Sequence, residues 1–295
     1  MDAISINEEQ RQVLLVKPEK ERHYGLDILR WLASVMVLVI HSSNFYYSCE
    51  FLSVCPGDGP MWAAALASLA RSSVPLFMML TGYFVLPMKD GASSFLKKRF
   101  MRVFLPYAFW CVIYAGYNVF LKNLNWPGFF YALIRIPLNY GTEVGHLWYI
   151  QMAIGVDLFI PIITPWLTSS NKEGYLYFLL LWGVSLFLPY LHLIYYYVFG
   201  EAFWNAIHTV YYFTGYLGYA VLGQYIRKFH SEKGRWDTLV GFLCFFIGGW
   251  LTMAIFVLRI GTAKNVIELE LSWGYLTINV AIMSLGSLVH AGSKS

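Results

Sequence analysis

Charged residues are scarce in this sequence. Asp, Glu, Lys and Arg make up 13% of its 295 residues, about half the fraction that is usual in soluble domains. The sequence also lacks a phosphate-binding glycine loop, a dinucleotide-binding glycine motif, an HExxH zinc motif and a CxxC pair. Carboxylates with glycosidase-like spacing are missing too. These absences argue against the common nucleotide-dependent, zinc-dependent, thiol-redox and sugar-cleaving classes of soluble enzyme.

We also expect no cleavable secretion signal. The first 22 residues are polar and of mixed charge, and no short apolar core with a small-residue cleavage site follows them. We therefore expect residues 1–22 to form a disordered tail on the cytosolic side. Residues 23–295 are expected to form one domain, because no internal repeat divides them. The net charge of +4 gives no reason to expect nucleic acid as a partner.

Hydrophobic residues, by contrast, make up 58% of the chain and raise its mean hydropathy to +0.53. They form runs of about 20 residues, the length that crosses a hydrocarbon core of about 30 Å. We predict an all-α, polytopic transmembrane helix bundle in contact with membrane lipids. The segment 126–140 is too short to cross and is predicted to be interfacial or re-entrant. The eight expected spans cover residues 26–47, 61–87, 99–121, 146–167, 174–191, 204–226, 237–259 and 271–290.

The basic residues are distributed unevenly between the two sides of the predicted bundle. Sixteen of the 21 Lys and Arg residues fall on one side and four on the other, and Arg71 lies within a span. Loops rich in Lys and Arg stay in the cytosol. We therefore expect both termini to be cytosolic, which an even number of spans allows.

The four cysteines fall into two groups. Cys49 and Cys55 share the short outward loop after the first span, where they either form a disulfide or remain as two free thiols. Cys111 and Cys244 lie within spans and are predicted to be small packing residues.

Five ionisable residues are predicted to lie inside spans, where an unpaired charge is costly. Two of them, Arg30 and His41, are 11 positions apart on the first span, so they share a helix face and are separated by about 16.5 Å along its axis. A cation and an imidazole on one stripe suit an extended ligand with an anionic head. The alternative is a snorkelling arginine and a histidine bonded to a neighbouring helix. The other three are Arg71, His146 and Asp157.

The fourth predicted span carries His146 at its outer end and Asp157 eleven residues deeper. A carboxylate in the middle of the membrane is expected to face the bundle interior and to have a cation or a donor as its partner. His41 and His146 are predicted at a similar outward depth, where two imidazoles could give and take a proton at an acceptor hydroxyl. We therefore predict His41, His146 and Asp157 as catalytic residues.

Arg71, Arg99 and Arg102 each come just before an apolar run. Arg71 precedes SSVPLFMMLTGYF, whose small residues let helices approach closely and line a cavity; a kinked helix with Arg71 reaching the interface is the alternative. Arg99 and Arg102 are three apart and are predicted to share a face at a helix N-terminus, which favours anions. Arginine suits bidentate contact with phosphate. Basic residues at a cytosolic helix end are, however, expected for topology alone.

Several motifs occur together and in order over residues 22–226. They are Arg30 and His41 in R-x10-H spacing, RSSVPLFMMLTGYF at 71–84, Arg99 and Arg102 in RxxR before Pro106, HLWYI at 146–150 before Pro161, and YYFTGYLGY at 211–219. With these motifs the chain resembles acyltransferase family 3, the multi-pass membrane O-acyltransferases that modify surface polysaccharides and related glycoconjugates. Asp157 departs from the pattern, because an aromatic or neutral residue is usual there. The family typically has about ten spans, so two terminal spans are expected to be missing.

The resemblance implies transfer of an acyl group, most often acetyl, from cytosolic acyl-CoA to a hydroxyl of an extracytoplasmic glycan or lipid-linked sugar. It implies His41 as the catalytic imidazole and Arg30, Arg99 and Arg102 as donor-binding residues, and we group Arg71 with them. No metal is expected, and the expected location is the bacterial inner (cytoplasmic) membrane. The alternatives are a membrane transporter or flippase and a non-catalytic membrane sensor.

Overall fold

The computed structural model describes residues 23–139, 145–230, 234 and 236–292. This part of the chain is helical, and two isolated bridges are its only β pairing. The prediction of an all-α fold is therefore confirmed. Within it, six helical segments are long and apolar enough to cross a membrane, and a pair bent by 41°, Gly59–Ala67 with Leu69–Val85, makes a seventh if it counts as one span. The six are Tyr24–Tyr46, Ala92–Phe120, Trp148–Ser169, Lys172–Leu191, Asp237–Arg259 and Val266–Val289.

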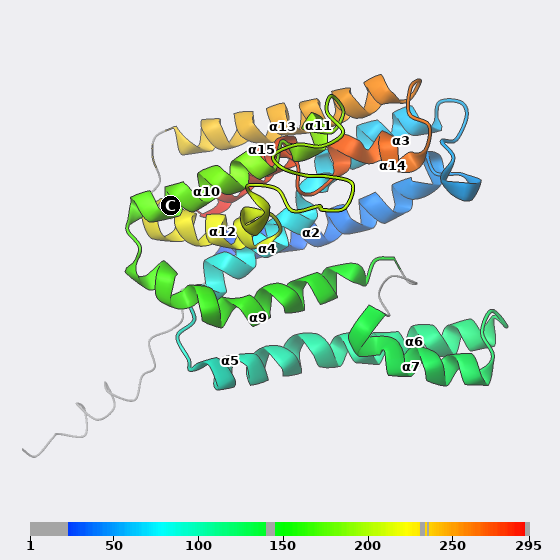
Figure 1. Ribbon diagram of the computed structural model, residues 1–295, viewed down its shortest axis with the longest axis horizontal. Coiled ribbons are helices and arrows are strands. Elements are labelled where there is room, and N and C mark those ends of the chain that lie inside the picture. Colours follow the sequence, from blue (N-terminus) through cyan, green and yellow to red (C-terminus); the bar gives the residue numbers. More distant parts are fainter. Residues whose placement is uncertain (1–22, 140–144, 231–233, 235, 293–295) are drawn as a thin grey trace, which may run out of the picture.

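One group of helices packs into a bundle (Figure 1). Within it α13 lies along α15, α4 lies along α12, and α2 contacts both α4 and α15. The bounds are α2 Tyr24–Ser43, α3 Gly59–Ala67, α4 Ser73–Val85, α10 Lys172–Ser185, α11 Leu188–Leu191, α12 Leu217–Phe229, α13 Asp237–Arg259, α14 Val266–Leu269 and α15 Ile278–Gly292. Short 3₁₀ segments join several of them: η1 Asn44–Tyr46, η2 Glu50–Leu52, η3 Leu69–Ser72, η5 Tyr211–Phe213 and η6 Glu270–Trp273.

A second layer lies beside this bundle (Figure 1). Helix α9 (Trp148–Ser169) lies between the bundle and a long helical run made of α5 (Ala92–Arg99), the π-helical turn η4 (Phe100–Phe104) and α6 (Leu105–Phe120). Helix α7 (Trp126–Asn139) packs against α6. With 14 residues, α7 is not among the span-length helices, as the sequence predicts for the segment 126–140.

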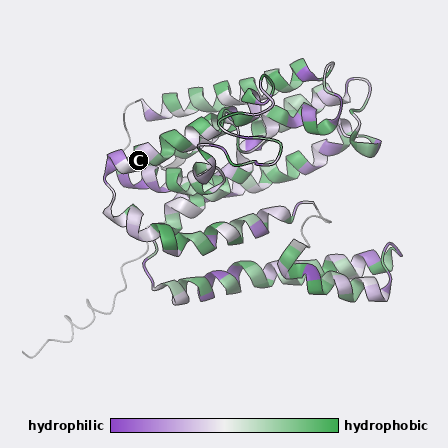
Figure 2. Ribbon diagram, in the orientation of Figure 1, coloured by the Kyte–Doolittle hydropathy of each residue, from purple (hydrophilic) through white to green (hydrophobic). Residues whose placement is uncertain are grey.

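Hydrophobic residues predominate along the long helices (Figure 2), and many of their large apolar side chains are exposed. Side chains such as Leu38, Phe120 and Leu180 leave about two thirds or more of their surface uncovered by protein. Apolar patches of this extent are rare on soluble monomers and are normal where helices face lipid. The surface therefore supports the multi-pass membrane assignment independently of helix length.

The tightest helix contact in the bundle joins α4 to α12, and it depends on two glycines. A Cβ atom added at Gly82 would lie 1.8 Å from the carbonyl oxygen of Ala220, and one at Gly223 would lie 2.0 Å from that of Met79. Both obstacles are backbone atoms, so no side-chain rotation relieves them. The absence of side chains at these positions lets the two helix backbones touch.

The sequence prediction of a continuous span over residues 204–226 is wrong. Helix α12 begins only at Leu217, and residues 204–216 are irregular apart from one bridge residue and the 3₁₀ turn η5. Gly215 has φ +99°, a left-handed conformation that ends any helical path there. The segment contains many aromatic residues, but its Trp, Tyr, Asn and His side chains make it much less apolar than a span.

The loop after α2 is closed by a disulfide between Cys49 and Cys55. This settles the alternative that the sequence left open. Cys111 and Cys244 are free, the first buried and the second half-buried, as expected for packing residues.

Candidate active site

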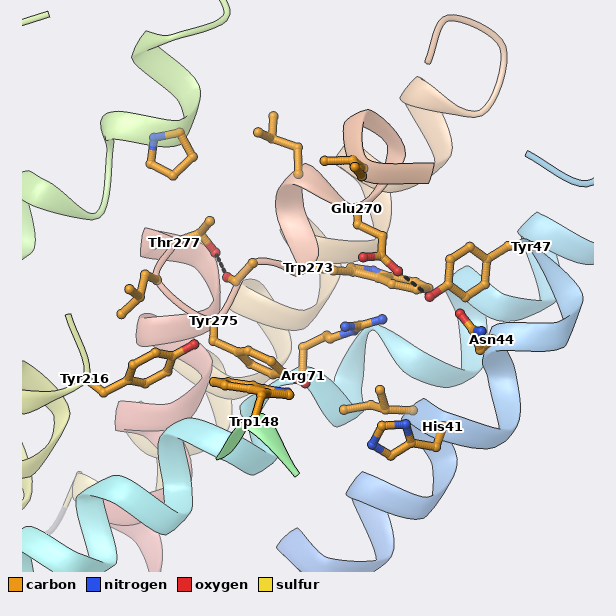
Figure 3. A pocket seen from close by; sticks show the side chains of 16 residues that line it. His41, Asn44, Tyr47, Arg71, Trp148, Tyr216, Glu270, Trp273, Tyr275 and Thr277 are labelled. Atoms are coloured by element: carbon orange, nitrogen blue, oxygen red, sulfur yellow. Dashed lines mark hydrogen bonds between the residues drawn. The ribbon is translucent and has the colours of Figure 1, made fainter. Parts of the chain in front are cut away.

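A cavity of about 610 Å³ opens where α2, η3, α9 and the segment from α14 to α15 meet. Residues from both ends of the chain therefore share its wall, and Figure 3 shows how their side chains point into it. Its polar and aromatic lining consists of His41, Asn44, Tyr47, Arg71, Trp148, Tyr216, Glu270, Trp273, Tyr275 and Thr277.

Two of the predicted catalytic residues meet at this cavity. His41 lies in the last turn of α2, and its ring centroid is 5.8 Å from that of His146, which precedes α9. The Tyr114 hydroxyl of α6 is 3.0 Å from Nε2 of His146 and forms a hydrogen bond with it. Three helices thus hold two imidazoles edge to face, and His41 is the one that lines the cavity. Such an arrangement can exchange protons with a bound hydroxyl.

Arg71 is in the wall of the same cavity. It belongs to η3, the break between α3 and α4, and only 6% of its surface is exposed. Its guanidinium lies 4.0 Å from the ring centroid of Trp273, a cation–π contact. Among the described residues, its buried Nε and Nη2 have no hydrogen-bond partner, and no carboxylate lies within ion-pair distance of the guanidinium.

A tyrosine and a carboxylate occupy the far side of the cavity from His41 (Figure 3). The buried Tyr47 donates a hydrogen bond to Oε1 of Glu270. Burial, and then the negative charge of Glu270, raise the pKa of Tyr47, so its phenol stays protonated and remains a donor. The ring of Trp273 stacks on Phe256 and its indole N–H donates to the Ser68 hydroxyl at 3.0 Å. These contacts fix the position of the Trp273 ring that the guanidinium of Arg71 contacts.

The third predicted catalytic residue lies elsewhere. Asp157, in the middle of α9, is 4% exposed and its Oδ1 is 2.8 Å from Nη2 of Arg99. It therefore has the cationic partner expected of a carboxylate in the membrane. The two groups form an ion pair whose orientation does not meet hydrogen-bond geometry at either carboxylate oxygen. They line a separate, mostly apolar cavity of about 380 Å³ between α5, η4 and α9, and neither lines the cavity of His41.

The sequence prediction that Arg99 and Arg102 lie at a helix N-terminus is wrong. The helix begins at Ala92, so both residues follow at least one full turn of helix. The π-helical turn that starts at Phe100 is wider than an α-helical turn, so residues three apart no longer share a face. Arg99 accordingly turns toward Asp157, whereas Arg102 is exposed. Anion binding here would depend on the arginine side chains alone.

Arg30 lies on the same continuous helix as His41, and both residues are exposed. It is 3.5 Å from Asp27 and its guanidinium lies 5.3 Å from the ring centroid of Phe84. The structure thus distributes the four predicted donor-binding arginines over three places. Arg30 is on α2, Arg99 and Arg102 are near the apolar cavity, and Arg71 is in the His41 cavity.

Sequence reasoning missed three residues of the site. Tyr114 bonds to His146, and Tyr47 bonds to Glu270 across 223 positions of sequence. Glu270 carries a usable signal, because it is an acidic residue inside the apolar run that the structure places in the span Val266–Val289. The predicted span begins one residue later, at 271, which hid this signal. Among the described residues no group of three or more His, Cys, Asp and Glu side chains could hold a metal ion.

Comparison with known proteins adds three findings. A family model described as acyltransferase domain matches residues 23–294. An amino-acid racemase of Enterococcus faecalis is 24% identical over 149 residues, which are 49% of this chain and 20% of the racemase. The chain thus matches about a fifth of the length of that relative. No solved structure matches.

Proposed function

This chain belongs to acyltransferase family 3, and from that premise we propose that it transfers an acetyl group from acetyl-CoA to a hydroxyl of an extracytoplasmic glycan or glycolipid. Family and helices together make it a multi-pass membrane acyltransferase. The acetyl-CoA donor, the glycan acceptor and a place in the bacterial inner membrane, with both termini in the cytosol, belong to the proposal. Its main support is the pair of imidazoles, His41 and His146, beside a cavity large enough for a sugar.

The proposed chemistry uses His41 as a general base. Its imidazole accepts the proton of the acceptor hydroxyl while the hydroxyl oxygen forms a bond to the thioester carbonyl carbon. The carbon–sulfur bond then breaks, and the CoA sulfur leaves with the proton held by the imidazolium. The products are an ester and free CoA thiol. Transient transfer of the acyl group to the imidazole nitrogen gives the same products. His146, fixed by Tyr114, orients the ring of His41 or shares its proton.

The donor is proposed to bind at the second cavity, beside Arg99. Arg99 and Arg102, with Arg30 on α2, supply positive charge for the nucleotide phosphates. The apolar cavity beside Arg99 can accommodate an uncharged arm. Arg99 is already paired with Asp157, so a phosphate has to compete with this carboxylate or share the guanidinium with it. Asp157 is thereby proposed to act on the donor side and not at the hydroxyl.

The test is acetyl transfer in membranes from cells that express the wild type, His41→Ala or His230→Ala. His230 is exposed at the end of α12 and lies outside both cavities, so it is the matched control. With radiolabelled acetyl-CoA, His41→Ala should lose about 100-fold or more of the label in glycan, the range for a general base. His230→Ala should retain it.

Mass spectrometry of envelope glycans, with and without the gene, identifies the acceptor. Near-normal labelling by His41→Ala at equal protein level would contradict the role of the imidazole. Solute uptake by reconstituted vesicles without acetyl-CoA would favour a transporter instead.

A further inference from the structure

Arg71 is a buried cation, and two of its three guanidinium nitrogens are not used by the described part of the protein. Nε and Nη2 have no hydrogen-bond partner among the described residues, although only 6% of the residue's surface is exposed. Burying a guanidinium without a carboxylate is costly. The contact with Trp273 compensates for part of its charge but leaves the N–H groups of Nε and Nη2 without an acceptor, since a ring face accepts none of them well.

The carboxylate in the lining of the cavity does not neutralise Arg71. Glu270 lines the same cavity, yet it accepts a hydrogen bond from Tyr47 and makes no ion pair with Arg71. Tyr47 and Tyr275 are phenols close to the guanidinium and interact with it, but they supply neither a carboxylate nor a phosphate. Fixed donors that converge on a cavity and lack an anion are the usual form of an anion-binding site.

The position of the guanidinium relates it to the reaction. His41 and Arg71 are in one wall of one cavity, which lies apart from the cavity of Arg99. Trp148, Tyr216 and Tyr275 also line this cavity, and the rings of Trp148 and Tyr275 are stacked with centroids 5.8 Å apart. Flat aromatic surfaces beside a charged group suit a ring-shaped polar ligand with one anionic substituent.

We propose that Arg71 binds an anionic group, a carboxylate or a phosphate, on the acceptor, and so makes the enzyme selective for acidic glycan residues. This inference rests on the proposed function, because the bound glycan is an acceptor only if the protein transfers an acyl group. It reassigns Arg71 from donor binding to acceptor recognition. Glu270, held by Tyr47, opposes anions on its own side of the cavity and thereby directs the charged substituent toward Arg71.

The experiment compares ligands that differ in charge but not in ring shape. Methyl glucuronide carries a carboxylate where methyl glucoside has a hydroxymethyl group, and glucose 6-phosphate carries a phosphate. Binding to the purified full chain in detergent is measured by the rise in unfolding temperature with ligand concentration, without any donor present. The wild type should bind at least one anionic sugar about ten-fold or more tightly than methyl glucoside, as expected for charge-assisted hydrogen bonds.

Two variants with opposite expected effects separate recognition from a structural role. Arg71→Gln should abolish the preference for the anionic sugar. Glu270→Gln keeps an oxygen that accepts from Tyr47 and removes a negative charge from the cavity, so it should tighten anion binding by about threefold. Lys264→Gln, an exposed cation in the loop before α14 that does not line the cavity, should leave binding unchanged. If Arg71 only supported the fold, both cavity variants would weaken binding or stability together.

The outcomes are distinguishable from those of the acetylation assay. A charge preference that Arg71→Gln abolishes supports the site even if no acetyl transfer is found, in which case only the proposed function fails. Binding of the carboxylate or of the phosphate sugar identifies the kind of acidic residue recognised. Equal binding of charged and neutral sugars, no binding of either anionic sugar, or an unchanged preference in Arg71→Gln would overturn the inference.

Discussion

Two arginines of this protein are buried to different extents, and their partners separate their roles. Arg99 neutralises a carboxylate at 2.8 Å in an apolar cavity, whereas Arg71 lies against an aromatic ring in a polar cavity with free donors. In the sequence both are basic residues near the start of an apolar run, so hydropathy and spacing cannot tell them apart. The difference arises only when α9 supplies Asp157 to one and the C-terminal segment supplies Trp273 to the other.

The ion pair of Arg99 and Asp157 should contribute to stability in an asymmetric way. Asp157 has 5% of its side chain exposed and Arg99 22%. Arg99→Gln leaves a buried carboxylate without its cation and should lower the free energy of unfolding by about 3 kcal/mol. Asp157→Asn should cost less, because Arg99 can turn toward water or headgroups. Thermal unfolding in detergent measures both.

The double variant Arg99→Gln with Asp157→Asn should recover part of the loss seen in Arg99→Gln alone, because no isolated charge remains. Lys98→Gln is the control, since Lys98 pairs with Asp90 at 2.7 Å but both side chains are about half exposed. An exposed pair contributes at most about 1 kcal/mol. Equal losses in the single and double variants would show that the pair is not coupled.

At the residue scale, the histidines were predictable and their neighbours were not. An imidazole inside an apolar run is conspicuous, and His41 and His146 are both of this kind. Tyr47 and Glu270 meet only because the first and last parts of the chain share one cavity wall. Nothing local in the sequence encodes a contact across 223 residues, so one sequence could not have paired them.

At the scale of elements, long continuous helices followed from the sequence and broken ones did not. Apolar runs bounded by polar residues predicted the helical spans at α2, α9 and α13 to within a few residues. The break at Leu69–Ser72 between α3 and α4, and the irregular stretch before α12, each adjoin an apolar helical run, so a coarse division of the sequence into spans joins them to it. Packing determines the backbone at these breaks, and an average over a span-length window does not locate them.

The close approach of α4 and α12 gives an element-scale prediction. Gly82→Ala and Gly223→Ala each place a methyl group against a carbonyl of the facing helix, so the helices must separate. Each should lower the free energy of unfolding by about 2–3 kcal/mol.

Gly116→Ala is the control for this pair, because a Cβ atom there meets nothing within 4 Å on α6. It should be neutral or stabilising by up to about 1 kcal/mol through helix propensity. Chemical or thermal unfolding compares the free energies of unfolding of the three variants. If Gly82→Ala behaved like Gly116→Ala, the two helices would be free to move apart at no cost.

At the scale of the whole molecule, the two cavities divide the proposed reaction between layers. The His41 cavity is assembled mainly by the bundle, and the apolar cavity by the outer layer of α5, η4 and α9. Helix α9 belongs to both, since Trp148 lines the first and Asp157 lines the second. A donor that reached from one to the other would run along α9, which makes this helix the structural link between the two substrates.

The proposed orientation of this molecule makes a prediction about its disulfide. With both termini in the cytosol, the loop that contains Cys49 and Cys55 lies outside, as the charge bias of the sequence indicates. In intact cells, with Cys111 and Cys244 replaced by serine, a membrane-impermeant maleimide should label the protein only after treatment with a mild reductant.

The exposed Ser93 at the start of α5 lies on the other side of the membrane in this orientation. Ser93→Cys, in a chain without its four native cysteines, should therefore react only after the membrane is opened. Labelling of Ser93→Cys in intact cells, together with protection of Cys49 and Cys55, would invert the topology, and the thioester would then have to arrive at the opposite face from the one proposed.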